Sequence, residues 1–274
     1  MEKRRPLIIA ALWIWWIVGI ITIAACYAIF QPWGPKLGMA ESPERIYLYY
    51  VYVLGHEVPA SLVCLYYWSK HQEWLAPPGR YISTKKYKMI NPWVLTGGAV
   101  MAALYGVFAL VGSAVPVPGG TLDLAATATA VMMTYFGAVT SGIAVLLGAI
   151  IRFLLTGRLP GLPLMWPAFA LADSYRWITN SYVYWRLVRV KREKPLKTWI
   201  YWGLLIPFII ANHRLSIFMQ HTWRYPLETL AAVWLGSMIP ALPFGILAIL
   251  VGVIVGETLY RMSSLKPTKV AVQK

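Results

Sequence analysis

The sequence predicts an all-α, polytopic membrane protein with about eight transmembrane helices. Of its 274 residues, 59% are hydrophobic and only 13% are charged, whereas charged residues make up about a quarter of a soluble domain. Apolar runs long enough to cross a bilayer as a helix, about 18 residues or more, recur along most of the chain. These two observations exclude an ordinary soluble domain.

The distribution of positive charge is the third observation. The net charge is +15, and 18 of the 25 lysines and arginines fall in four clusters, at Lys3–Arg5, Lys70–Lys88, Arg186–Lys197 and from Arg261 to the C-terminus. Each cluster flanks an apolar run, which is typical of cytoplasmic loops under the positive-inside rule. The lipid bilayer or an acidic partner therefore accounts for the charge better than DNA does, and no nucleic-acid binding is expected.

The apolar runs divide into eight candidate spans. In chain order they are Pro6–Phe30, Ile46–Trp68, Trp93–Ala114, Thr121–Phe136, Val139–Thr156, Leu164–Val188, Trp199–Phe218 and the stretch Leu227–Met262. A turn at Gly137 separates the fourth from the fifth. Pro240 and Pro243 are expected to break the last stretch, so that a short helix or re-entrant piece precedes the final crossing.

The charge clusters also give an orientation. If the N-terminus is cytoplasmic, all four basic clusters fall on the cytoplasmic side, whereas the loops around Gly119, Pro160 and Tyr225 fall on the other side. This predicts a multi-pass protein of the cell membrane with both termini in the cytoplasm. The chain then divides into two N-terminal transmembrane helices (1–68), a basic cytoplasmic loop (69–92), a six-helix membrane bundle (93–262) and a cytoplasmic tail (263–274).

The bundle contains a characteristic order of motifs. Its first span reads TGGAVMAALYGVFALV, in which Ala99 and Ala103 form an AxxxA pair, and the loop PVPGGTLD leads into a helix of small residues. A turn at FGAVTSG and the Gly-containing helix IAVLLGAIIRFLLTGRLP follow. In this order, residues 93–262 resemble the substrate-binding S component of an energy-coupling factor (ECF) transporter. The two N-terminal spans depart from the usual six helices of that family.

The resemblance implies a subunit that binds a vitamin-like micronutrient at its outer side and is energised by partner ATPases through a membrane scaffold subunit. Ala99 and Ala103 would then lie against the scaffold, since small residues let two helices approach closely; packing inside this chain is the alternative. The chain has no phosphate-binding Gly-rich loop and no dinucleotide fingerprint, so neither enzyme activity nor a cofactor is expected. The competing function is an accessory or structural subunit of a larger membrane complex, respiratory or secretory.

The sixth span carries the densest set of polar side chains. Asp173, Arg176, Trp177 and Asn180 share one helix face. Polar groups at membrane depth are costly and so are candidates for function. Trp177 and Asn180 suit the stacking and hydrogen bonding of a heteroaromatic solute. Alternatively, Asp173 and Arg176 simply neutralise each other as a buried pair.

Three more residues are candidate solute contacts. Asn212 and His213 interrupt the seventh span, where helix–helix hydrogen bonding is the alternative role. Asp123 opens a helix of small residues, which its neighbours are expected to shield from lipid. There it either caps the helix or touches a ligand. The spacing of His213 and His221 is poor for a shared metal ion, so no metal site is predicted.

The second span places His56 and Glu57 just before Pro59, in LGHEVPASL. The pair suits a proton-linked site or a hydrogen bond that supports a kink at the proline. A membrane enzyme that uses the two residues is the least favoured of the three functions. Near the C-terminus, Gly252 and Gly256 form a GxxxG pair that predicts close helix packing.

Overall fold

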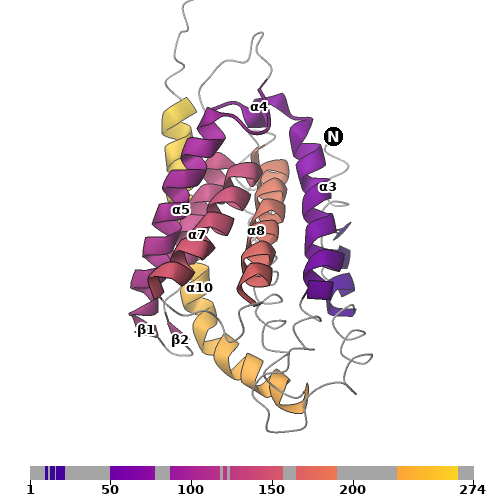
Figure 1. Ribbon diagram of the computed structural model, residues 1–274, viewed down its shortest axis with the longest axis vertical. Coiled ribbons are helices and arrows are strands. Elements are labelled where there is room, and N and C mark those ends of the chain that lie inside the picture. Colours follow the sequence, from indigo (N-terminus) through magenta and orange to yellow (C-terminus); the bar gives the residue numbers. More distant parts are fainter. Residues whose placement is uncertain are drawn as a thin grey trace, which may run out of the picture.

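A computed structural model gives the fold. It describes residues 10–11, 13–15, 17–21, 50–77, 87–117, 120–121, 124–156, 165–189 and 227–264. Within these ranges the chain is mostly helical, as predicted, and the helices stand side by side as a bundle (Figure 1). The described strands, β1 (Pro116–Val117) and β2 (Gly120–Thr121), form a short antiparallel hairpin in the loop after the third predicted span.

The described helices follow the predicted spans closely. Their bounds are η3 (Val53–Glu57), α3 (Val58–Ser69), α4 (Gln72–Leu75), α5 (Pro92–Ser113), α6 (Leu124–Val131), η4 (Met132–Phe136), α7 (Ala138–Thr156), α8 (Met165–Tyr184), η5 (Trp185–Arg189) and α10 (Leu227–Ser264). Among the residues that the structure describes, three segments are long and apolar enough to cross a membrane, namely Pro92–Ser113, Ala138–Leu155 and Leu242–Ser263. The seventh predicted span and most of the first lie outside the described residues.

The start of α5 shows how local sequence fixes a helix boundary. The side-chain oxygen of Asn91 accepts a hydrogen bond from the Val94 backbone N–H at 3.2 Å, which satisfies one of the donors left open at a helix start. Pro92 takes the first helical position, where its missing N–H costs nothing. The helix therefore begins within one residue of the predicted position.

Small residues set the packing of the bundle. α5 packs along α7, α7 along α8, and α6 along α10. At the α5–α7 contact, Gly98 faces Ile143 and Gly106 faces Ile151. α6 is largely buried, through Ala125, Ala126, Ala128, Thr129 and Ala130. The prediction that neighbouring helices shield this small-residue segment is confirmed.

One end of the bundle is closed by packed aromatic rings. This aromatic end consists of Trp68, Trp74, Trp93, Phe136, Trp185 and Tyr260. The ring centroids of Trp68 and Trp185 are 5.2 Å apart, and those of Trp185 and Tyr260 are 5.8 Å apart. The rings of Trp93 and Phe136 stack with their centroids 5.0 Å apart. Phe136 directly precedes Gly137, which lies against the Trp68 ring.

The aromatic end gathers positive charge from distant parts of the chain. Lys70 follows Trp68 closely, Arg186 directly follows Trp185, and Arg261 directly follows Tyr260. Three of the four basic clusters therefore begin at the same end of the bundle. The N-terminal cluster lies outside the described residues.

Gly137 makes the turn between η4 and α7, as predicted. Its φ of 87° lies in the region that favours glycine. Its N–H donates to the Met132 carbonyl at 3.0 Å, which closes the wide helical turn of η4. The neighbouring carbonyl, that of Met133, accepts a hydrogen bond from the Trp185 indole N–H at 2.8 Å. The turn thus joins α6, α7 and η5.

Gly137→Ala should destabilise the protein by about 2 kcal/mol, because alanine is strained at this backbone conformation. Its Cβ would also collide with the Trp68 ring. Thermal unfolding of the purified variant in detergent measures the loss. Gly55→Ala is the matched control, since nothing lies within 4 Å of a Cβ at that helical position. Equal stability of the two variants would contradict the role given to Gly137.

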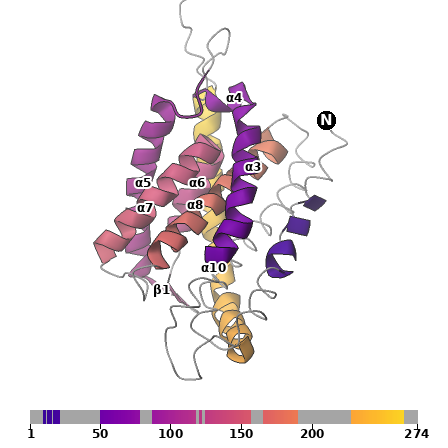
Figure 2. The same cartoon turned by 45° about the vertical axis from the view of Figure 1, so that its right-hand side comes forward.

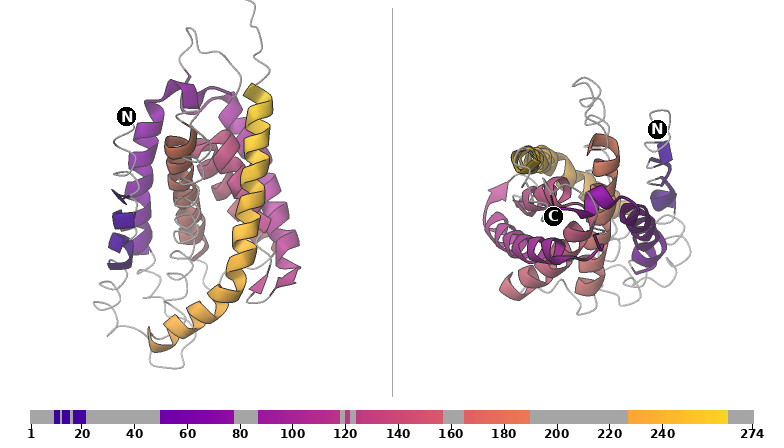
Figure 3. Two further views of the ribbon diagram at one scale, coloured as in Figure 1. Left: turned by 180° about the vertical axis from the view of Figure 1, so that it is seen from behind. Right: turned by 90° about the horizontal axis from the view of Figure 1, so that it is seen from above.

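The prediction of a break at Pro240 and Pro243 is wrong. α10 runs without interruption from Leu227 to Ser264 with both prolines inside it. Its first part, in orange, is turned away from the rest of the helix, in yellow, in the views from both sides (Figures 1 and 3). Proline removes one backbone hydrogen bond and bends a helix, and a long apolar helix can accept that bend without ending.

Candidate functional site

The four polar residues predicted in the sixth span lie together on α8. Asp173, Arg176, Trp177 and Asn180 are all buried, and Arg176 is only 1% exposed. A guanidinium withdrawn so completely from solvent needs a partner, because burying a lone charge costs on the order of several kcal/mol.

Asp173 supplies that partner. Its carboxylate forms an ion pair with the Arg176 guanidinium one helical turn later. The Tyr105 hydroxyl of α5 lies 3.4 Å from the second carboxylate oxygen and donates to it. Mutual neutralisation of Asp173 and Arg176, one of the two roles predicted for them, is therefore present in the structure. Tyr105 is a further member of this polar group. Helical spacing within the sixth span does not indicate it, because it lies on α5.

The neighbouring face of α8 makes polar contacts with α7. The Ser174 hydroxyl donates to the Gly142 carbonyl at 2.8 Å, and the Ser181 hydroxyl donates to that of Ser141 at 3.0 Å. Gly142 has no side chain, which leaves room for Ile178 of α8. These contacts hold α8 at a fixed rotation, so they set the direction in which Asp173 and Arg176 point.

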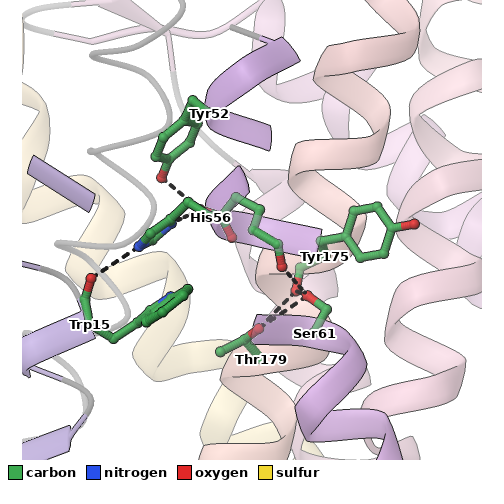
Figure 4. A network of polar contacts seen from close by, with 7 residues as sticks. Trp15, Tyr52, His56, Ser61, Tyr175 and Thr179 are labelled. Carbon is green, nitrogen blue, oxygen red and sulfur yellow. Dashed lines mark hydrogen bonds and ion pairs between the residues drawn. The ribbon is translucent and has the colours of Figure 1, made fainter. Parts of the chain in front are cut away.

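A third set of contacts joins α8 to α3, which the sequence assigns to the N-terminal pair of spans. The Ser61 hydroxyl lies 2.7 Å from the Tyr175 carbonyl and 3.3 Å from the Thr179 hydroxyl (Figure 4). Figure 2 shows α3 and α8 next to each other, and the two helices are in contact. No local pattern in the sequence indicates this contact, since Ser61 and Tyr175 are 114 positions apart.

The other predicted residues do not join this group. Asp123, Asn212 and His213 lie outside the described residues. Ala99 and Ala103 lie on α5, and both are exposed. The close contacts of α5 with α7 use other positions, such as Gly98.

The chemistry of the α8 residues suits binding. An ion pair, an indole and an amide offer charge, a stacking surface and hydrogen bonds within about two helical turns. In the part of the chain that the structure describes, no three His, Cys, Asp or Glu side chains are grouped so that they could hold a metal ion. Comparisons of the chain with protein-family models, with curated proteins and with solved structures gave no significant match.

Proposed function

We propose that the chain is the solute-binding membrane subunit of an uptake system, similar to the S component of an ECF transporter. Partner ATPases would supply the energy through a membrane scaffold subunit. The observation that carries the proposal is the buried polar face of α8, where Asp173 and Arg176 lie close to Trp177 and Asn180. Apolar residues of similar size often stabilise a core as well as a buried ion pair does, so the presence of this pair favours a role beyond packing.

Each side chain has a role in this proposal. The Arg176 guanidinium presents a planar fork of donors, so it can bind a carboxylate or carbonyl of the solute while Asp173 balances its charge. Trp177 provides a flat surface for a heteroaromatic ring. Asn180 can both donate to such a ring and accept from it. A vitamin-like solute with a polar heterocycle fits this combination.

The proposed topology has eight spans across the cell membrane. Both termini lie in the cytoplasm, and the solute binds from the extracellular side. The gathering of Lys70, Arg186 and Arg261 near the aromatic end supports it, because loops rich in lysine and arginine stay in the cytoplasm. Exposure of Ala99 and Ala103 supports a contact with the scaffold, since small side chains let a partner helix approach closely.

Native mass spectrometry of the purified chain tests the binding role. The wild-type protein should retain a vitamin-sized molecule, and Trp177→Ala should lose it because the stacking surface is gone. Asp173→Asn/Arg176→Gln should also lose the molecule, and it leaves neither charge buried alone. Leu154→Ala is the control, since Leu154 is 78% exposed and lies on a different helix. Thermal unfolding of each variant confirms that it is folded.

Two outcomes would count against the proposal. Retention of the molecule by both α8 variants would show that it binds elsewhere. A chain that is empty and co-purifies only with large respiratory or secretory subunits would instead favour the accessory role. The exposed face of α5 is compatible with such subunits as well as with a scaffold, so co-purification partners must be identified in the same experiment.

A further inference from the structure

A second buried polar group lies on the segment before α3, around η3. Tyr52, His56 and Glu57 are each at most 2% exposed. His56 and Glu57 belong to a wide helical turn, and such turns often occur at functional sites. The contacts described above for Asp173 and Arg176 do not include these residues.

The His56 ring is held in a defined position. It stacks on Trp15, which lies in the helical part of the first predicted span (here called the first helix), with ring centroids 4.6 Å apart, and on Tyr52 with ring centroids 5.2 Å apart (Figure 4). Its Nε2 lies 3.0 Å from the Trp15 carbonyl oxygen. Because a carbonyl only accepts hydrogen bonds, Nε2 must carry a hydrogen. The hydrogen bond thus fixes the tautomer and leaves Nδ1 as the nitrogen that can take a second proton.

Glu57 is placed to share that proton. Its Oε1 accepts a hydrogen bond from the Tyr52 hydroxyl at 2.7 Å. The same oxygen lies 3.8 Å from His56 Nδ1, which has no hydrogen-bond partner in the described structure. This separation is too long for a hydrogen bond. A small change of side-chain rotamer would close it.

The described neighbours of the pair offer it little positive charge. With a neutral His56 and an ionised Glu57, the pair would carry one buried negative charge. In the described parts of the first helix, η3, α3 and α8, Arg176 is the only lysine or arginine, and it is paired with Asp173. The other titratable groups there are tyrosines and Cys64, which supply no positive charge. One additional proton makes the pair neutral, whichever of its two groups holds it.

We propose that His56 and Glu57 form a proton-binding site inside the bundle. The pair holds one proton, either as a Glu57 carboxylic acid beside a neutral His56 or as a His56 imidazolium beside the carboxylate. In passing between these forms, the O–H bond of Glu57 breaks as an N–H bond forms at Nδ1, and the net charge stays zero. The Trp15 carbonyl holds the ring in both forms, so the first helix stays attached to η3.

Spectroscopy of the full-length protein in lipid nanodiscs tests this directly. Nuclear magnetic resonance of ¹⁵N-histidine reports the charge and tautomer of His56, and infrared spectroscopy reports the carbonyl band of a protonated Glu57. At neutral pH we expect either the imidazolium signal or the carboxylic acid band, and Glu57→Gln should abolish whichever is present. A neutral His56 together with an ionised Glu57 would overturn the proposal.

Two sets of variants keep the test decisive. The chain has four histidines, and loss of a signal in His56→Asn assigns it. If that variant does not fold, His71→Asn, His213→Asn and His221→Asn assign the signal by elimination with the site intact. Tyr52→Phe removes a donor that stabilises the carboxylate, so it should lower the share of imidazolium or leave the acid as the only form. A rise in that share would contradict a shared proton.

Discussion

Arg176→Gln should lower the free energy of unfolding by about 3–5 kcal/mol, which is the usual cost of removing one partner from a buried ion pair. The variant leaves the Asp173 carboxylate buried without its counterion, and the Tyr105 hydroxyl at 3.4 Å is a weak replacement. Reversible unfolding of the purified protein in mixed micelles measures the loss. A smaller fraction of the variant that stays folded in detergent would be a qualitative sign of the same loss of stability.

A double-mutant cycle separates the pair from other effects of the substitution. Asp173→Asn/Arg176→Gln should recover much of the stability, because no buried charge is left alone. Arg261→Gln is the matched control: it removes an arginine that is 79% exposed in its side chain and lies 3.8 Å from Glu257, a pair worth about 0–1 kcal/mol. Additive effects of the two α8 substitutions, within about 0.5 kcal/mol, would show that the ion pair does not contribute.

Gly252→Leu should be the second severe substitution, with a loss of about 3 kcal/mol from overpacking. A Cβ at this position would meet the Thr127 carbonyl oxygen and lie 2.6 Å from the Ala130 Cβ. Backbone atoms cannot move aside cheaply, so α10 would have to withdraw from α6. The hydrogen bond from the Thr127 hydroxyl to the Ala248 carbonyl, 3.0 Å long, would be lost as well.

The control for this substitution lies on the same helix. A Cβ at Gly236 would have nothing within 4 Å of it, so Gly236→Leu should change stability little. Thermal unfolding of the two variants in the same detergent gives the comparison. Similar losses at both positions would mean that the helix itself, and not the contact with α6, is sensitive to leucine.

Local sequence was enough to locate many of the helices. α5, α7 and the turn at Gly137 lie within a residue or two of their predicted positions, because capping residues, apolar length and a required positive φ are local properties. The prolines of α10 were misjudged for a related reason. Proline always removes a hydrogen bond, but whether the helix then ends or bends depends on the residues packed around it.

The candidate site was predictable only where its members share a helix. Asp173 and Arg176 are three positions apart, so helical spacing alone indicates their ion pair. The contact of His56 with Trp15 joins residues 41 positions apart, and that of Ser61 with Tyr175 joins residues from different predicted domains. Such contacts depend on which helices lie next to each other in space. Local sequence patterns do not indicate that arrangement.

The wide turn of η4 determines which substitutions the protein can accept next to it. Because the Gly137 N–H bonds to Met132, the Met133 carbonyl is released from the helix ladder and receives the Trp185 indole instead. The acceptor in this joint is a backbone atom, which any residue at position 133 would still provide. A substitution at that position therefore cannot remove the acceptor, so the sequence requirement of this joint falls on Trp185, which donates the hydrogen bond, and on Gly137, which makes the turn.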